Sequence, residues 1–295
     1  SRNGHQYISD KITSLPSAYD WSTININEDL EELRMFLSEN YLEAEGIYRY
    51  DLSTSHIRWI LMFPNCSNGI YLGIRQKENQ KLVGFISATP SNITIHHKPL
   101  HTGFINLLCV RKDKRYKNFV PLLVQEIRRR LGTSTPIVPT ALYTLERPLG
   151  HFPLTTSKCY HKSLNFVKLL DIGWITTINE DLSSYNSSSS HDNYSISSNT
   201  DSSRGKIDDH FSNQVLEKYL RLDGTTSNGV VNEAYSLWKR HVSQGKLYQN
   251  FSFEEFTHTF IFNSDSTSND EMEKKVISTY YLCNEAGEVT DLTSF

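Results

Sequence analysis

Seven consecutive residues, 111–117, carry five basic side chains and only one acidic one, Asp113. The basic members are Arg111, Lys112, Lys114, Arg115 and Lys117. An apolar run of a β-strand type precedes them at 104–110, and a helical pattern follows them. A helix start presents unpaired backbone N–H groups and the positive end of the helix dipole, both of which attract anions. This stretch therefore predicts a site for a phosphate-bearing ligand.

Two other readings of this basic loop are possible. Five basic residues in an arbitrary loop are usually a solvated surface run, and only the position before a helix favours phosphate. The loop is neither a GxxxxGK[ST] nor a GxGxxG motif. A nucleic-acid partner is disfavoured because the whole chain has a net charge of −3, and only Tyr116 and Phe119 interleave with the basic residues. A small anionic ligand fits the local charge better.

The helix after the loop is predicted to begin just after Asn118, because Pro121 is tolerated only in a first turn. Its buried face should hold residues at successive i, i+4 steps and their neighbours: Phe119, Val120, Leu123, Val124, Ile127 and Leu131. Three arginines, 128–130, are expected to complement the negative end of the helix dipole.

Upstream elements should support this strand, loop and helix. We predict a helix at 28–42 with Asn27 as N-cap, and a short helix after Ser53 and Thr54 that ends before Pro64. A hairpin at 70–75 and 81–88, followed by strands at 91–97 and 104–110, would form an antiparallel meander. His96 and His97 would face opposite sides of a strand and His101 the surface, so no metal site is expected.

The C-terminal part repeats this order of elements. Residues 183–203 are rich in Ser and Asn and predict a disordered insertion. Beyond it, helices are expected at 230–242 and 252–262, the second opened by a capping box from Ser252 to Glu255. Strands at 275–283 and 289–295 would follow. Helix, helix, hairpin is also the order at 28–88, which indicates an internal duplication.

Composition limits the class of protein. The chain has 295 residues with 38% hydrophobic content, enough for two domains or for one large duplicated domain. Its four cysteines are too far apart for a zinc site or a disulfide framework, which suggests a reducing compartment. These are Cys66, Cys109, Cys159 and Cys283. No long apolar run or signal peptide is visible, so we expect a soluble cytoplasmic protein without stable membrane insertion.

Several blocks together resemble the eukaryotic glycylpeptide N-myristoyltransferases. They are KLVGFISATPSNITI (81–95), INLLCV (105–110), RKDKRYKNFVPLLVQEIRRR (111–130), ALYT (141–144), YHKSLN (160–165) and GEVTDLTSF (287–295). The resemblance runs from Leu15 to Phe295. It implies an α+β fold of two tandem halves like the GNAT acyltransferases, which hold coenzyme A at such a loop.

The expected segments are a flexible arm (1–14), an acyl-CoA-binding half (15–182), the insertion (183–212) and the start of a second half (213–295). The implied activity is transfer of a myristoyl group from myristoyl-CoA, a co-substrate and not a bound cofactor, to the N-terminal glycine of peptides and proteins. The resemblance implies no metal, and we expect a monomer.

The resemblance also assigns roles by position. Backbone groups of Leu107 and Leu108 would form the oxyanion hole, with Cys109 and Val110 lining the ligand. The loop and helix start would meet the CoA phosphates through Arg115, Tyr116, Lys117, Asn118, Phe119 and Val120. Tyr143, Thr144, Tyr160 and His161 would lie towards the peptide. From its sequence context alone, His161 could equally be a histidine at a helix start.

Some positions depart from the family pattern. The family has a phenylalanine at Leu107, and a serine, an arginine and an alanine at Tyr116, Asn118 and Val120. Tyr116 would then crowd the pyrophosphate and Asn118 would remove a charge, which predicts weaker CoA binding.

We also expect an incomplete chain. The family's upstream acyl-CoA segment and the C-terminal carboxylate that serves as its base are not found, and Phe295 corresponds to Phe85 of the first half. This predicts weak or no activity for the chain alone. Alternatives are a GNAT-type enzyme for shorter acyl chains and a non-catalytic CoA-binding or scaffold protein.

Overall fold

The computed structural model describes residues 11–44, 48–64, 70–134, 136–144, 153–156, 168–169, 172, 219–262 and 276–294. Residues 1–144 and 210–295 form one compact unit, and residues 145–209 form another. Most of the second unit, including the predicted insertion, lies outside the described residues. The helices and strands with defined bounds lie in the first unit.

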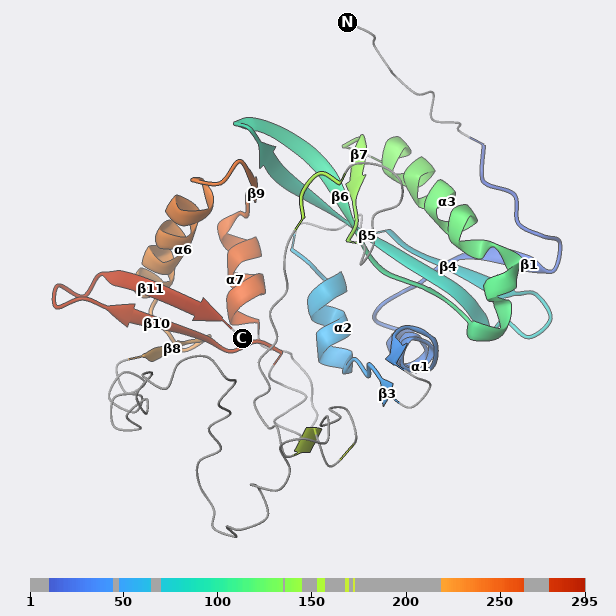
Figure 1. Cartoon of the computed structure of the whole chain (residues 1–295), viewed down its shortest axis with the longest axis horizontal. Helices are drawn as coiled ribbons and strands as arrows, with labels where there is room; N and C mark the ends of the chain where they lie inside the picture. The colour runs from blue at the N-terminus through green and yellow to red at the C-terminus, as the bar shows by residue number, and fades with distance from the viewer. Residues whose placement is uncertain are drawn as a thin grey trace, which may run out of the picture. The chain divides into compact units, whose positions relative to one another are not determined.

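Its larger sheet has the order β1-β4-β5-β6-β7 (Figure 1). The strands are β1 (Tyr19–Thr23), β4 (Ile70–Gln76), β5 (Leu82–Ile95), β6 (Lys98–Val110) and β7 (Thr140–Leu142). Neighbours are antiparallel except β6 and β7, which run parallel. A further strand, β9 (Leu247–Gln249), pairs with the far end of β5.

Helices cover both faces of this sheet because its strands alternate apolar residues between two sides. On one side, α1 (Leu30–Asn40) and α2 (Thr54–Leu61) form a core with Phe85, Leu107 and Cys109. On the other, α3 (Phe119–Thr133) packs on Ile86 and Ala88. A small hairpin of β2 (Glu43–Ala44) and β3 (Tyr48–Arg49) joins α1 to α2.

The predicted helices are present, with one wrong cap. Helix α2 begins at Thr54, one of the two residues predicted to precede it, and Ser53 is its N-cap, with its side chain accepting a hydrogen bond from the His56 N–H at 3.1 Å. The N-cap of α1 is Asp29 and not Asn27. Asn27 instead donates its N–H to the Asn25 side chain at 3.1 Å, and Asp29 accepts from the Asn25 N–H at 2.8 Å. These two contacts build a turn that delays the helix.

The predicted strands 81–88 and 91–97 are one strand, β5. Proline is tolerated at position 90 because only β6 pairs with β5 between Ala88 and Ile93. The placement of His96 and His97 on a strand was wrong. They form the two-residue turn between β5 and β6, with φ of 45° and 65°. Strand β6 consequently begins at Lys98 rather than at 104.

The predicted repeat in element order is confirmed and extends further. The second set consists of β8 (Leu220–Leu222), α6 (Asn228–Val242), α7 (Phe253–Ile261), β10 (Thr279–Cys283) and β11 (Val289–Ser294). Its sheet has the order β8-β10-β11, which matches β1-β4-β5. In both sets a strand before the helices pairs with the first hairpin strand. The sequence analysis missed β8 and β9, each of only three residues.

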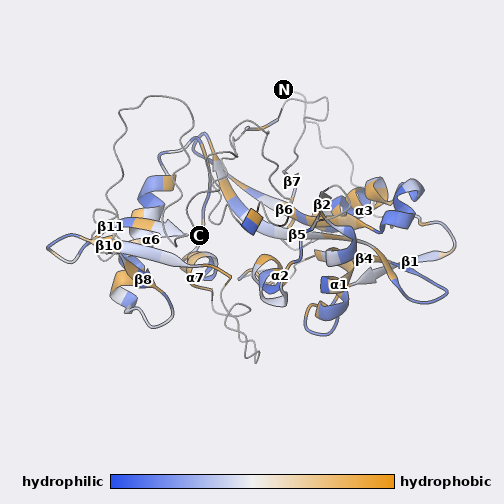
Figure 2. Cartoon of the chain, turned by 60° about the horizontal axis from the view of Figure 1, so that its bottom comes forward, coloured by the Kyte–Doolittle hydropathy of each residue, from blue (hydrophilic) through white to orange (hydrophobic). Residues whose placement is uncertain are grey.

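The second set has its own apolar core, which includes Ala234, Phe256 and Tyr281. The predicted capping box of α7 is confirmed: Ser252 accepts from the Glu255 N–H, and Glu255 accepts from the Ser252 N–H. Figure 2 shows how hydrophobic and hydrophilic residues are distributed over these elements. In the parts of the chain described here, no helix combines the length and apolar character that crossing a membrane requires.

Candidate functional site

A β-bulge lies near the C-terminal end of β6. The register passes from Phe85 opposite Cys109 to Ser87 opposite Asn106, so that Leu107 and Leu108 together face Ile86. Leu107 has a φ of 51°, a left-handed conformation that costs a leucine about 1–2 kcal/mol. The extra residue of a bulge leaves the regular hydrogen-bond ladder. The backbone at these two leucines is therefore the irregular point of the sheet.

The side chains around the bulge point into both cores. Leu107 and Cys109 pack on the α1 and α2 side, whereas Leu108 and Val110 pack on the α3 side. Burial raises the pKa of the Cys109 thiol to about 12, although Arg115 and Lys112 act to lower it. The thiol is protonated at neutral pH, so Cys109 contributes apolar surface rather than a nucleophile.

The basic loop that follows is a short 3₁₀ helix, Lys112–Lys117, and ends at Asn118. Asn118 adopts φ 54° and ψ 37°, a left-handed conformation that asparagine tolerates better than most residues. The C-terminal residue of α1 holds the loop: Asn40 accepts from the Lys112 N–H through its side chain at 3.1 Å and from Arg115 through its carbonyl at 2.9 Å. The Asn40 amide itself donates to Phe36 O at 2.8 Å.

The five cations of the loop are not equivalent. Asp113 binds both Arg111, at 3.0 Å, and Lys114, at 3.3 Å. Desolvation acts to raise the pKa of Asp113, but the hydrogen bonds from Lys114 and Arg111 outweigh it and lower the pKa. Neither Arg115 nor Lys117 has an ion-pair partner within the described ranges. These two cations carry the positive charge available to a ligand.

Helix α3 begins after Asn118 as predicted, and four of its six predicted core residues are buried. Phe119, Leu123, Ile127 and Leu131 are each at most 2% exposed. The expectation for Val120 and Val124 was wrong, because both are 44% exposed. Glu126, which was not among the predicted core residues, is buried together with the four apolar ones. The Phe119 ring also contacts Tyr19 edge-on, with centroids 4.8 Å apart.

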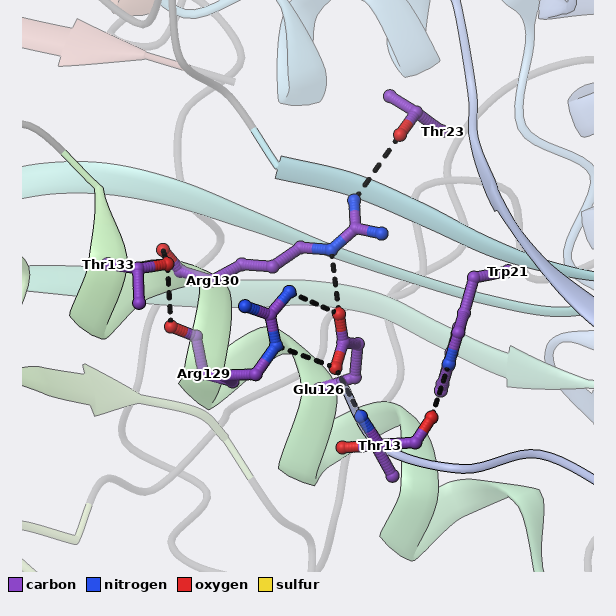
Figure 3. A network of polar contacts seen from close by, with 7 residues as sticks. All are labelled: Thr13, Trp21, Thr23, Glu126, Arg129, Arg130 and Thr133. Carbon is purple, nitrogen blue, oxygen red and sulfur yellow. Dashed lines mark hydrogen bonds and ion pairs between the residues drawn. The ribbon is translucent and has the colours of Figure 1, made fainter. Parts of the chain in front are cut away.

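Glu126, which the sequence analysis missed, is fully buried at the centre of a polar network (Figure 3). Its carboxylate accepts hydrogen bonds from Arg129 at 2.7 Å, Arg130 at 3.1 Å and the Thr13 N–H at 3.0 Å. Burial acts to raise the pKa of Glu126, but these bonds outweigh it and lower the pKa to about 2. Arg129 and Arg130 thus hold a carboxylate, in addition to lying near the helix end as predicted.

The same network holds the chain ahead of β1. Thr13 is 9% exposed, and its carbonyl accepts a hydrogen bond from the Trp21 indole at 2.7 Å. Residues 1–10 lie outside the described residues. A sequence signal was available: a glutamate inside an apolar helical stripe with arginines at i+3 and i+4 is a pattern for local ion pairs.

Two of the four residues expected near the peptide are described. Tyr143 is 59% exposed and Thr144 is also exposed. They follow β7, whose residue Leu142 pairs with Phe104 in parallel register. Since the strands are parallel, the chain leaves β7 in the direction in which β6 approaches Leu107. Tyr160 and His161 lie outside the described residues.

The described ranges hold no group of three or more His, Cys, Asp or Glu side chains that could bind a metal ion. His101, considered in the sequence analysis, contacts the Asn92 side chain at 3.0 Å. The arrangement can instead offer backbone N–H groups at a strained bulge and a cationic loop four to ten residues after Leu107. The start of α3 follows that loop directly.

Comparison with known proteins identifies similar chains. The family model for myristoyl-CoA:protein N-myristoyltransferase, N-terminal domain, matches residues 2–159, and that for the C-terminal domain matches residues 206–295. The glycylpeptide N-tetradecanoyltransferase of Saccharomyces cerevisiae is 30% identical over 298 residues, which cover 98% of this chain and 58% of the relative. That of Plasmodium falciparum is 30% identical over 286 residues, covering 95% and 60%.

Solved structures agree with these matches. A crystal structure described as Saccharomyces cerevisiae N-myristoyltransferase with bound myristoyl-CoA superposes with a TM-score of 0.76 at 27% identity. The match covers 97% of this chain and 62% of that one. The chain therefore spans about three fifths of the length of the proteins it matches.

Proposed function

This chain belongs to the myristoyl-CoA:protein N-myristoyltransferase family, and from that premise we propose that it acts in the transfer of a myristoyl group from myristoyl-CoA to the N-terminal glycine amine of peptides and proteins. The amine nitrogen attacks the thioester carbonyl carbon and loses a proton, the carbon–sulfur bond breaks, and the CoA thiolate takes up a proton and leaves as the thiol. What this chain supplies is the means to hold the thioester and to stabilise the charge that develops on its oxygen.

We assign the oxyanion hole to the backbone N–H groups of Leu107 and Leu108. The support is the bulge, which removes one residue from the ladder, and the left-handed conformation of Leu107. Strain of this kind persists where the surrounding structure maintains it, and the flanking side chains Leu107 and Cys109 are anchored in a core. Loss of one oxyanion donor typically slows acyl transfer by about 10²–10³-fold.

The CoA phosphates belong, in this proposal, at the 3₁₀ loop and the start of α3. Arg115 and Lys117 supply the charge, Asn118, Phe119 and Val120 supply N–H groups at the helix start, and Tyr116 lies between them. Cys109 and Val110 line the ligand between the thioester and the phosphates through their backbone, because their side chains are buried in the two cores. Arg115 donates a hydrogen bond to the Asn40 carbonyl at 2.9 Å. This contact already restricts the Arg115 side chain, so less conformational entropy is lost when a ligand binds.

The acceptor peptide is assigned to the side of Tyr143 and Thr144, together with Tyr160 and His161. The support for the first two is their exposure and the parallel register of β7 and β6. The second pair rests on the resemblance alone. A monomeric state and weak activity of these 295 residues on their own remain predictions.

The single observation that carries the proposal is the direct succession of bulge, cationic loop and helix start within 15 residues, Leu107 to Pro121. Calorimetric binding of acetyl-, octanoyl- and myristoyl-CoA tests it. A pocket for a long acyl chain should gain about fourfold in affinity for each methylene that becomes buried. A flat series would favour an enzyme for shorter acyl chains, and no binding of any of the three would refute CoA chemistry.

Turnover tests the activity itself. Release of CoA thiol would be followed with myristoyl-CoA and an octapeptide that begins with glycine, and the same peptide beginning with alanine serves as the control. A rate for the glycine peptide typical of the family would contradict the predicted weak activity of this chain alone while supporting the assigned reaction.

A further inference from the structure

Tyr116 is the most exposed large apolar side chain of the described structure and stands inside the cationic loop. It is 70% exposed, more than any other large hydrophobic residue in the described ranges. The face of an exposed aromatic ring beside a ligand site offers a surface on which a flat group of the ligand can stack. The sequence analysis expected this side chain to crowd a pyrophosphate. Its exposure leaves the ring open to contact with a ligand.

The next residue fixes a cation beside this ring. The Lys117 Nζ atom lies 5.1 Å from the Tyr116 ring centroid, within the range of a cation–π contact. In the parts of the chain that the structure describes, Tyr116 has no ring-to-ring contact, so a face remains for a flat partner. The two residues together present an aromatic surface and a positive charge a few ångströms apart.

Within the described ranges, the charge of Lys117 is not paired with a carboxylate. Asp113 takes Arg111 and Lys114, and Arg115 is held at Asn40. Lys117 has the Tyr116 ring as its contact and no carboxylate partner among the described residues. A ligand that carries a planar ring and an anion in close proximity would satisfy both side chains at once.

Coenzyme A has such a group at the end remote from its thioester, because its adenine and 3′-phosphate are attached to the same ribose. We propose that the adenine ring of bound acyl-CoA stacks on Tyr116 while Lys117 contacts the 3′-phosphate. The inference rests on the proposed function, which puts the pyrophosphate at the neighbouring helix start. It makes Tyr116 a binding residue for the nucleotide rather than an obstacle to the pyrophosphate.

Three ligands that lose one group at a time test this assignment. Calorimetry would compare myristoyl-CoA, its 3′-dephospho form and myristoyl-4′-phosphopantetheine, which has no nucleotide. Tyr116→Ala should weaken the first two ligands equally, by about fivefold or more, because aromatic stacking on a base contributes at least that factor. Binding of the third ligand should not change. Tyr116→Phe keeps the ring and should bind all three like the wild type.

Lys117→Ala provides the second arm. It should weaken myristoyl-CoA more than the dephospho ligand, so that the preference for the 3′-phosphate shrinks. A direct spectroscopic readout is the adenine H2 and H8 resonances, which should shift upfield on binding to the wild type and to Tyr116→Phe but not to Tyr116→Ala.

The outcomes separate the two hypotheses. The adenine assignment would be overturned if Tyr116→Ala bound myristoyl-CoA as tightly as the wild type or more tightly. It would also be overturned if the substitution weakened myristoyl-4′-phosphopantetheine as much as myristoyl-CoA. Either result would leave the proposed function standing. A wild-type chain that binds none of the three acyl ligands would refute the proposed function and this inference with it. Because Tyr116 is exposed, its substitution should not unfold the protein, and a thermal melt of each variant checks this.

Discussion

In the described part of the chain, the contacts of each charged side chain determine its protonation. Two acidic residues of the basic loop and the helix after it illustrate this. Asp113 is exposed and shared between two cations of the loop, whereas Glu126 is fully buried and bound by two arginines and a backbone N–H. A buried carboxylate is tolerated only where such partners replace its water. Glu126 is therefore the residue where the largest pH effect is expected.

We expect Glu126 to make the protein sensitive to acid. Its pKa in the folded state is about 2, below its ordinary value of 4.5, so the stabilisation that it gives is fully present above pH 4.5 and is lost as the pH falls towards 2. Glu126→Gln should lower the free energy of unfolding by about 2–4 kcal/mol at pH 7. Urea unfolding at pH 7 and pH 3 measures this.

The variant should also lose less stability than the wild type between these two pH values. Glu78→Gln, which changes an exposed carboxylate in the turn between β4 and β5, is the control. Equal losses for wild type and Glu126→Gln on acidification would contradict the role of Glu126.

We expect Cys109 to resist alkylation in the folded protein. Its thiol is 3% exposed and has a pKa of about 12, so almost no thiolate exists at pH 8. Iodoacetamide treatment followed by peptide mass spectrometry should leave Cys109 unmodified until urea is added. Cys283, which is partly exposed, should react first and serves as the internal control. Rapid labelling of Cys109 in the folded state would show that the bulge opens to solvent.

At the scale of elements, strand β5 has one buried face that passes from an apolar to hydroxyl-bearing side chains along its length. Its face towards α1 and α2 begins with Phe85 in the core and continues with Ser87, Thr89 and Ser91, all buried. Ser87 donates to the Asn106 carbonyl at 2.9 Å, but the hydroxyls of Thr89 and Ser91 have no hydrogen-bond partner among the residues that the structure describes. A buried hydroxyl without a partner destabilises the fold.

This difference between hydroxyls predicts opposite effects of the same substitution. Thr89→Val should raise the free energy of unfolding by about 0.5–1.5 kcal/mol, because it removes an unpaired buried hydroxyl while keeping the shape. Thr102→Val, on the neighbouring strand β6, should lower it by a similar amount, since Thr102 donates to the Thr140 carbonyl at 3.2 Å. Chemical unfolding of both variants checks this. A loss of stability in Thr89→Val would indicate that its hydroxyl does have a partner in solution.

At the scale of the whole molecule, strand pairing, hydrogen bonds and ring contacts join the two similar sets of elements. Strand β9, which lies between α6 and α7 of the second set in the sequence, pairs with β5 of the first set, with Ile93 opposite Gln249. Helices α2 and α7 also exchange hydrogen bonds: the Trp59 indole donates to the His258 carbonyl at 3.1 Å, and the His258 ring donates from Nε2 to the Trp59 carbonyl at 2.8 Å. Phe63 packs against the His258 ring as well, with centroids 5.2 Å apart.

His258 should therefore weaken this junction in mild acid. Burial lowers its pKa from the ordinary value of 6.5, although the hydrogen bond to Trp59 acts to raise it. The unfolded chain then binds a proton that the folded chain does not, so stability falls as the pH drops below about 6.5. Melting temperatures at pH 7.5 and pH 5.5 should differ more for the wild type than for His258→Gln, which can still donate to the carbonyl but does not titrate.

His56, whose pKa is also lowered by burial, is present in both proteins, so the difference between them isolates His258. Identical shifts for wild type and His258→Gln would rule out this contribution.

Sequence patterns alone were sufficient for features that depend on near neighbours. The starts of α2 and α7, the four core residues of α3 and the repeated order of helix, helix and hairpin all follow from caps, proline and periodicity. The family also follows from local blocks such as INLLCV. These features need only residues a few positions apart, and the chain itself provides that proximity.

The remaining features required contacts between distant residues, which only tertiary structure provides. The bulge at Leu107 exists because β5 and β6 are out of step by one residue, and no pattern in either strand shows that. The distribution of loop charge depends on Asn40, and the burial of Glu126 on Thr13, each more than 70 residues away. The exposure of Tyr116 and Val120 likewise depends on what packs around them, because a side chain's surroundings are set by the whole fold.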